Sequence, residues 1–282
     1  MVRQLRRLLR LGRLAWFMLV SLFVAYPLLD FQRRYGRRPF ADYQQAAAGW
    51  WSRKLCRILN LRIRVDGDIG LAPILFVANH ISWLDIIALR ARLDAVFVAK
   101  EEIRGWPVFG GLAARTGTLF LRRGEQSPYI AEQMTIRLKA QRSVLFFPEG
   151  TSSGGETVEH FHARLYQAAV QADTKAQAVA IRYPHPEGVN PLAPFVGEDV
   201  LLAHLWRLLG EPMLEVSLNF CPSITATGAP RRALAEHTQS QIRAIIHDHR
   251  IPVRPAASPV DDALDEVCEA AMYSSAPLSQ QA

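Results

Sequence analysis

Short runs of β-branched and aromatic residues alternate with helix-like segments through the middle of the chain, and this alternation most limits the possible folds. The expected strands cover residues 61–65, 74–78, 95–99, 118–121, 144–147, 178–183 and 214–220. The expected helices cover residues 84–92, 108–115, 128–141, 161–172, 200–209 and 231–249. Parallel strands need long crossover connections, which helices supply. The sequence therefore predicts an α/β fold: a mixed, largely parallel sheet flanked by helices.

The 282 residues divide into three parts by composition. Residues 1–60 are basic and apolar, and we expect them to form membrane-anchoring helices. Residues 61–250 carry the strand–helix alternation and are the expected catalytic domain. Residues 251–282 are rich in Pro, Ala and Ser, which predicts a flexible tail with a short helix near 261–272. Hydrophobic residues make up 50% of the chain and charged ones 21%, which excludes a disordered protein.

The net positive charge of the chain comes from its N-terminal residues. The formal net charge is +7, but residues 1–40 contain nine Arg and one acid, Asp30, a net of +8. The remaining bases and acids nearly cancel, leaving a net of −1. A nucleic-acid-binding protein usually spreads basic residues over a folded face. This distribution instead favours membrane lipid as the partner, and no nucleic acid.

Between the two Arg clusters lie sixteen residues without a charge, Leu14 to Leu29. A spanning helix needs about 20 apolar residues, and Pro27 is expected to bend or end this one. A helix buried in one leaflet and a membrane-spanning helix both remain possible. A signal peptide and a soluble core helix are less consistent, since no cleavage site follows and the run is apolar all round. Trp50 and Trp51, beside basic residues, predict either a second interfacial helix or a helix that packs on the domain.

Cysteine and histidine patterns give little sign of a metal. The three cysteines, Cys56, Cys221 and Cys268, are far apart and predict neither a disulfide framework nor a zinc site. His160 and His162 have metal-like spacing but no third ligand nearby in sequence. We therefore expect a cytosolic catalytic domain without a metal or other cofactor.

The first loop with chemical potential follows the expected strand at 74–78. His80 stands just after this strand, and Asp85 lies in the first turn of the next helix. Catalytic groups collect at the carboxyl ends of such strands. Asp85 could orient His80, which would then act as a general base. Alternatively, Ser82 and Asp85 resemble a capping box that only satisfies the helix N-terminus.

The second loop, residues 148–155, is rich in glycine and serine and follows the expected strand at 144–147. Gly150, Ser152 and Gly154 match the G-x-S-x-G pattern of serine hydrolases. An esterase or lipase with Ser152 as nucleophile is therefore a second hypothesis. Its partners would be Asp199 and then His204 or His237.

Taken in order, these and neighbouring motifs resemble those of the glycerolipid acyltransferases, best known from the 1-acylglycerol-3-phosphate (lysophosphatidate) acyltransferases. The resemblance covers about residues 70–185. Its motifs are Asn79-His80-x-x-x-x-Asp85, Phe97-Val98-Ala99-Lys100 with the segment to Gly110, Gly117-x-x-Phe120-x-x-Arg123, Phe147-Pro148-Glu149-Gly150-Thr151 and the weaker Ala178-Val179-x-Ile181. The ordered set is specific where each motif alone is not.

The resemblance implies direct transfer of a fatty acyl group to a lipid hydroxyl from a thioester, either acyl-CoA or acyl carrier protein. It implies that His80 is the general base and Asp85 its orienting partner. Substrate-binding residues carried over in the same way are Arg123, Glu149, Gly150, Thr151, Gly117, Phe120 and Lys100. It also implies a location at the cytoplasmic membrane, with the catalytic domain facing the cytoplasm.

Two departures bear on the acceptor. Ser152 stands where the family usually has Arg, and Ala178 stands where it usually has Pro. The first removes one cation that could bind phosphate. The default acceptor is 1-acylglycerol-3-phosphate, which would give phosphatidic acid, and the alternative is a phosphate-free lyso-lipid such as lyso-ornithine lipid.

Overall fold

The computed structural model describes residues 1–36, 40–106, 109–122 and 127–247. One sheet forms its centre, with strands in the order β1-β9-β6-β2-β5-β3-β4 and β10 beside β6. The strands are β1 (Leu61–Asp66), β2 (Ile74–Ala78), β3 (Ala95–Lys100), β4 (Leu119–Leu121), β5 (Ser143–Phe146), β6 (Lys175–Arg182), β9 (Leu214–Phe220) and β10 (Ile224–Thr225). A separate two-stranded ribbon joins β7 (Pro184–His185) and β8 (Gly188–Val189).

Most neighbours in the sheet are parallel. β6, β2, β5, β3 and β4 pair parallel, and β1 pairs parallel with β9. β9 and β10 are antiparallel to β6. The predicted mixed, largely parallel sheet is therefore confirmed.

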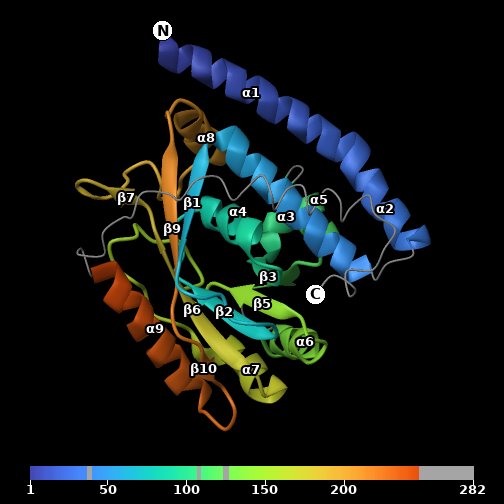
Figure 1. The fold of residues 1–282 in the computed structure, drawn as a ribbon, viewed down its shortest axis with the longest axis vertical. Coiled ribbons are helices and arrows are strands. Elements are labelled where there is room, and N and C mark those ends of the chain that lie inside the picture. Colours follow the sequence, from blue (N-terminus) through green and yellow to red (C-terminus); the bar gives the residue numbers. More distant parts are fainter. Residues whose placement is uncertain (37–39, 107–108, 123–126, 248–282) are drawn as a thin grey trace.

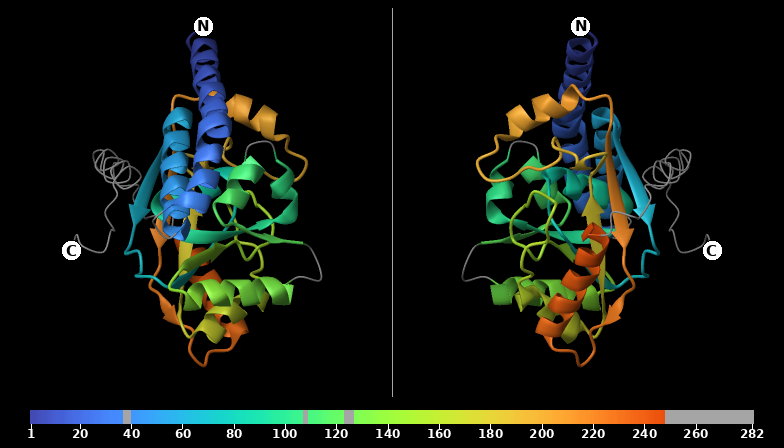
Figure 2. Two further views of the ribbon diagram at one scale, coloured as in Figure 1. Left: turned by 90° about the vertical axis from the view of Figure 1, so that its right-hand side faces the viewer. Right: turned by 90° about the vertical axis from the view of Figure 1, so that its left-hand side faces the viewer.

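Helices cover both faces of the sheet (Figures 1 and 2). They are α1 (Val2–Val20), η1 (Ser21–Ala25), α2 (Tyr26–Tyr35), α3 (Phe40–Leu59), α4 (Trp83–Arg92), η2 (Glu101–Gly105), α5 (Phe109–Arg115), α6 (Ser127–Lys139), η3 (Ala163–Tyr166), α7 (Gln167–Ala172), α8 (Leu201–Leu209) and α9 (Arg231–His247). Successive residues of a strand point to opposite faces. Accordingly, Ile74 and Phe76 share one core with α3 and α4, while Leu75 and Val77 share the other with α6, α7 and α9.

The observed strands match the expected ones closely, except that β6 begins at Lys175 rather than at residue 178. Its first three residues are not β-branched or aromatic, so the sequence carries little strand signal there. These residues are extended because of strand pairing: Ala176 lies between Leu75 of β2 and Ile224 of β10.

The N-terminal apolar run lies within one long helix, Val2–Tyr35, which is long and apolar enough to cross a membrane by length and composition. The helix does not end at Pro27. A π-helical turn, η1, changes the backbone hydrogen-bond pattern just before Pro27, which stands in the first turn of α2. A missing amide hydrogen is tolerated at that position.

This long helix lies lengthwise against the domain (Figure 1). Near its start, Arg10 donates to the carbonyl oxygens of Glu211 and Pro212 at 2.5 and 3.0 Å. Near its end, the Arg115 guanidinium lies 4.5 Å from the Tyr26 ring centroid and 3.3 Å from Asp30. The helix is thus held at both ends by the body of the protein.

Trp50 and Trp51 belong to α3, which packs between the long helix and α4. Trp51 is 5% exposed, and its indole N–H donates to Ser21 Oγ at 2.8 Å. Trp50 packs beside Phe17, with ring centroids 6.2 Å apart. Of the two alternatives from sequence, the packing helix is therefore the one observed.

Candidate active site

Two loops meet at the carboxyl ends of neighbouring strands. The loop after β2 carries His80, and the loop after β5 carries Glu149; Val77 and Phe146 are partners in the register of these two strands. Asn79 joins the first loop to β6, because its side chain exchanges hydrogen bonds of 3.0 and 2.7 Å with the backbone of Ile181. Side chains distant in sequence are thereby brought to one edge of the sheet, as expected for an open α/β sheet.

His80 and Asp85 form a close pair. The Nδ1 atom of His80 lies 2.8 Å from Asp85 Oδ2, and the imidazole stacks on Phe147 with ring centroids 4.1 Å apart. The side chain of His80 is 19% exposed, whereas that of Asp85 is fully buried. Within the described residues, His80 Nε2 has no hydrogen-bond partner. The arrangement leaves this nitrogen available to a substrate proton.

Asp85 is held by groups on both of its oxygens. The backbone N–H groups of Ile81 and Ser82 donate to Oδ2 at 2.7 and 2.9 Å, and the Tyr183 hydroxyl donates to Oδ1 at 2.7 Å. Burial, together with the nearby charge of Asp85, raises the pKa of Tyr183 well above its ordinary value. The hydroxyl therefore stays protonated and can donate. Asp85 caps α4 and orients His80, so the two alternatives inferred from sequence hold together.

Glu149 joins the two loops. Its Oε1 accepts the backbone N–H of His80 at 2.8 Å, and its Oε2 accepts that of Glu159 at 3.2 Å. The residue is only 5% exposed, and this burial raises the pKa of its carboxyl to about 7 against the lowering effect of the two backbone hydrogen bonds. From the opposite side, Ser153 N–H donates to the His80 carbonyl oxygen at 2.8 Å. The backbone at His80 is thus fixed from the second loop.

An open cleft of about 370 Å³ lies beside these loops. Its lining consists of Glu149, Thr151, Ser152, Ser153, Gly154, Glu159, His160, His162 and Val196. Of the predicted substrate-binding residues, Glu149 and Thr151 reach this cleft. Gly150 stands between them with φ +70°, a conformation that glycine adopts without strain.

The other predicted substrate-binding residues lie elsewhere or outside the described residues. Lys100 ends β3, and Phe120 is a buried residue of β4 with the Arg104 guanidinium 4.5 Å from its ring centroid. Gly117 precedes β4 with φ +77°. None of these three lines the cleft beside Glu149. Arg123 lies outside the described residues, so the substrate-binding roles stay predictions.

Ser152 lacks the geometry of a hydrolase nucleophile. Its hydroxyl donates to the backbone carbonyl of Phe195. The proposed partner His204 is buried in another interaction: Trp83 donates to its Nδ1 at 3.0 Å, and its Nε2 lies 2.9 Å from the Leu192 carbonyl oxygen. His237 is an exposed residue of α9. The expected triad is therefore not assembled.

The two histidines of the metal-like pattern lie side by side in the cleft wall, with His160 and His162 ring centroids 5.4 Å apart. Within the described ranges, no group of three or more His, Cys, Asp or Glu side chains could hold a metal ion.

Tyr183 and Phe195 are site residues that sequence reasoning did not single out, and Phe147 belongs to a predicted motif but was given no role. Tyr183 contacts Asp85, Phe147 stacks on His80, and the Phe195 backbone N–H donates to Ile81 O at 2.9 Å. A polar side chain at the end of an apolar strand was a usable signal for Tyr183. Phe195 lies in an irregular segment and carried no such signal.

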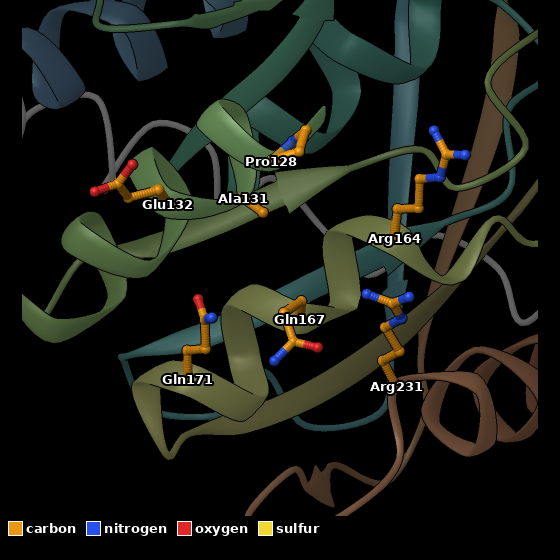
Figure 3. A pocket seen from close by; sticks show the side chains of 7 residues that line it. All are labelled: Pro128, Ala131, Glu132, Arg164, Gln167, Gln171 and Arg231. Atoms are coloured by element: carbon orange, nitrogen blue, oxygen red, sulfur yellow. The ribbon is translucent and has the colours of Figure 1, made fainter. Parts of the chain in front are cut away.

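A larger hollow of about 650 Å³ lies away from this site, between α6, η3, α7 and the start of α9 (Figure 3). Its wall includes Arg164, Arg231, Gln167, Gln171 and Glu132. It shares no lining residue with the cleft beside Glu149. We therefore place the candidate active site at His80 and the cleft.

Comparison with known proteins identifies the family of this chain. The family model described as Acyltransferase matches residues 62–182, a range that contains His80, Asp85 and Glu149. A lyso-ornithine lipid O-acyltransferase of Pseudomonas aeruginosa is 36% identical over 252 residues, which are 89% of this chain and 97% of that protein. This chain belongs to the acyltransferase family. It is an enzyme that transfers acyl groups.

Other acyltransferases are similar in sequence or fold. A 1-acyl-sn-glycerol-3-phosphate acyltransferase of Neisseria gonorrhoeae is 35% identical and covers 64% of this chain and 76% of its own. The crystal structure of the acyltransferase PlsC from Thermotoga maritima has the same fold, with a TM-score of 0.66 at 19% identity, covering 89% of this chain and 98% of that one. Family membership and the N-terminal apolar helix together indicate association with a membrane.

Proposed function

We propose that this acyltransferase esterifies the free hydroxyl of a lyso-lipid with an acyl group taken from acyl-CoA or acyl carrier protein. The observation that carries the proposal is the His80–Asp85 pair at 2.8 Å, with Nε2 left available at the end of β2. An alcohol is a weak nucleophile at neutral pH, so a positioned base contributes directly to the rate. The acyl group is already activated as a thioester, so the proposal includes no resident cofactor.

The proposed reaction proceeds in two proton transfers. His80 Nε2 takes the proton of the acceptor hydroxyl as its oxygen bonds to the thioester carbon. The tetrahedral intermediate then expels the thiolate, which takes the proton back from Nε2. Asp85 accepts the Nδ1 hydrogen of His80, which keeps Nε2 in the unprotonated tautomer at the start and stabilises the imidazolium afterwards.

For the acceptor, we favour a phosphate-free lyso-lipid of the lyso-ornithine type. The described residues that line the cleft include Glu149, Glu159 and two histidines, and no Lys or Arg. Such a lining suits a headgroup that carries an ammonium better than one that carries a phosphate. The Pseudomonas relative acts, by its name, on lyso-ornithine lipid.

The second candidate acceptor is 1-acylglycerol-3-phosphate. The similarity to the Neisseria enzyme named for it favours this candidate. So does the predicted role of Arg123, whose guanidinium would suit an anionic headgroup.

An acceptor panel tests both candidates. Purified enzyme is supplied with labelled acyl-CoA or acyl carrier protein and with lyso-lipids that do or do not carry phosphate. His80→Ala should lower turnover about 10²–10⁴-fold, the usual contribution of a general base. Ser152→Ala should retain most of it. Failure of every acceptor with the wild-type enzyme would refute the acceptor proposal, and the reverse order of the two variants would indicate a hydrolase.

We further propose that the long helix lies in one leaflet rather than across the bilayer, at the cytoplasmic membrane with the catalytic domain in the cytoplasm. The contacts of Arg10 and Tyr26 with the domain, near opposite ends of the helix, support this placement. A helix that crossed the bilayer would lose one of them.

A further inference from the structure

Helix α8 exposes an apolar face. Leu202 is 74% exposed, Val200 just before the helix 63%, and Trp206 40%. The charged side chain on this helix, Arg207, lies 3.6 Å from Asp199. A helix that faces water normally carries polar residues on its outer side. Helix α9 of this protein does so, with Arg232, Glu236 and His237 exposed.

Helix α8 is joined to the N-terminal helix by arginines. Arg6 donates to the Gly210 carbonyl oxygen at 2.8 Å, Arg10 donates to those of Glu211 and Pro212, and Arg3 pairs with Glu211 at 2.6 Å. The C-terminal end of α8 therefore lies against α1, although the two helices run in different directions (Figure 2).

The exposed Trp206 of α8 lies beside α1. The Arg7 guanidinium lies 5.1 Å from the Trp206 ring centroid. In the same part of α1, Leu5, Leu8 and Leu9 are 58%, 61% and 56% exposed.

The segment that leads into α8 is also joined to the candidate active site. Val196 lines the cleft, and its N–H donates to Asp199 at 3.0 Å. Phe195 just before it bonds to Ile81, the neighbour of His80, and accepts the hydroxyl of Ser152. An interaction that fixes the position of α8 therefore also fixes the position of Val196 in the cleft wall.

We propose that α8, with Val200, is a second membrane-contacting element that lies in the interface of the lipid leaflet and sets the cleft at the lipid surface. Nine residues are too few to span a bilayer, so the helix lies in its plane. An exposed tryptophan between two arginines, Arg7 and Arg207, suits the headgroup region. Contact with the N-terminal helix, which is long and apolar enough to cross a membrane, favours a lipid leaflet over a second copy of the chain. The role of α8 in acceptor entry rests on the proposed function, whereas its lipid contact does not.

Fluorescence quenching tests the contact without any activity measurement. Leu202→Cys, in a full-length Cys268→Ser chain, is labelled with an environment-sensitive fluorophore; the other two cysteines, Cys56 and Cys221, are buried. Vesicles of phosphatidylcholine and phosphatidylglycerol carry brominated acyl chains. The matched control is Ile136→Cys on α6, where the native residue is 47% exposed.

The label at 202 should shift its emission to shorter wavelength and be quenched, while the label at 136 should remain as in water. Equal behaviour of the two labels would overturn the proposal. So would a concentration-dependent shift at 202 without vesicles, because a second copy of the chain would then cover the face.

A Val200→Ser/Leu202→Ser variant separates positioning from chemistry. Its kcat/KM for a long-chain acceptor in vesicles should fall about tenfold, which corresponds to losing part of the burial of two apolar side chains. Turnover of a water-soluble short-chain acceptor should stay within about twofold, as should that of Ile136→Ser on both acceptors. Equal losses on both acceptors would contradict positioning at the membrane. If the wild type used neither acceptor, the proposed function would fail, while the quenching result would stand.

Discussion

At the scale of single residues, the candidate site depends on what surrounds His80 more than on His80 itself. Asp85 receives two backbone N–H groups and the Tyr183 hydroxyl in addition to the imidazole. Apart from the imidazole, the donors are two backbone N–H groups and the hydroxyl of a buried side chain. These groups hold the carboxylate in one orientation. This fixed partner is the feature that sets His80 apart from an ordinary loop histidine.

Asp85→Asn should therefore impair turnover more than binding. An amide presents an N–H group to one of the positions where donors already point, and the favoured tautomer of His80 changes. We expect kcat to fall about 10²-fold or more, with KM changed far less. Steady-state kinetics with the preferred acceptor measures both. Tyr183→Phe serves as the control, because it removes one hydrogen bond and leaves the carboxylate; a loss as large as that of Asp85→Asn would contradict the tautomer argument.

Glu149 should make stability depend on pH. Its folded-state pKa of about 7 is raised above the ordinary value of 4.5 by burial. A raised pKa means that the folded state binds the proton more tightly, so stability is greatest below pH 4.5 and is lost as the pH rises through about 7. Over that window the loss is on the order of 3 kcal/mol.

Glu149→Gln carries no titrating proton and should lack this loss. Thermal unfolding of both proteins is measured between pH 5 and 8. As the pH rises, the melting temperature of the wild type should fall relative to that of Glu149→Gln. Glu159→Gln, at an exposed neighbouring position, should track the wild type. A constant difference between wild type and Glu149→Gln would show that the carboxyl does not titrate in this range.

At the scale of elements, the loop after β5 acts as a brace for the loop after β2. Gly155 has φ +86°, and a Cβ atom there would lie 2.8 Å from Ile81 Cδ1. Ile81 is fully buried and its backbone N–H binds Asp85. A side chain at 155 would therefore press on the segment that positions His80 and Asp85.

Gly155→Ala should destabilise the protein by about 1–3 kcal/mol, through the left-handed backbone and the contact with Ile81, and should also lower turnover. Gly154→Ala is the matched control, because nothing lies within 4 Å of its Cβ position. We expect it to stay within about 0.5 kcal/mol of the wild type. The melting temperature and kcat of both variants test this prediction. Similar values for the two variants would show that the loop after β5 does not support the loop after β2.

At the scale of the whole molecule, the N-terminal helix is part of the folded body, although its length and composition would also allow it to cross a membrane. Leu14 and Leu29 are buried in the same core as α3 and α4. Three arginines of its first cluster contact residues about 200 positions away in sequence, at the end of α8. The last carbonyl groups of a helix lack partners within it, and cations are favourable there. This Arg cluster, for which the sequence predicts contact with lipid, therefore also binds the body of the protein.

Arg10→Ala and Arg13→Ala should consequently behave differently. Arg10 holds carbonyl groups of Glu211 and Pro212, whereas Arg13 is exposed. Arg10→Ala should lower the free energy of unfolding by about 1 kcal/mol. Arg13→Ala should leave stability unchanged and weaken binding to anionic vesicles by about 1 kcal/mol, roughly fivefold. Thermal unfolding and vesicle flotation test the pair, and equal effects in both assays would argue against the division of roles.

Much of the molecule followed from local signals. Strand and helix periodicity predicted the layers, and the spacing of Asn79, His80 and Asp85 predicted that His80 and Asp85 would meet, because adjacent residues of a loop and the first turn of a helix need little tertiary information to do so. The ordered motifs predicted the acyltransferase family. In contrast, the roles of Lys100, Gly117 and Phe120 remain predictions, and Arg123 lies outside the described residues.

What only the tertiary structure decided depends on contacts between segments far apart in the chain. Tyr183 on Asp85, Glu149 on the His80 backbone and the arginines on the end of α8 all arise this way. Such contacts form when a sheet brings several loops to one edge or a helix end meets a charged side chain. Neither event leaves a periodic pattern in the sequence, because periodicity records which face of an element is buried and not what it is buried against.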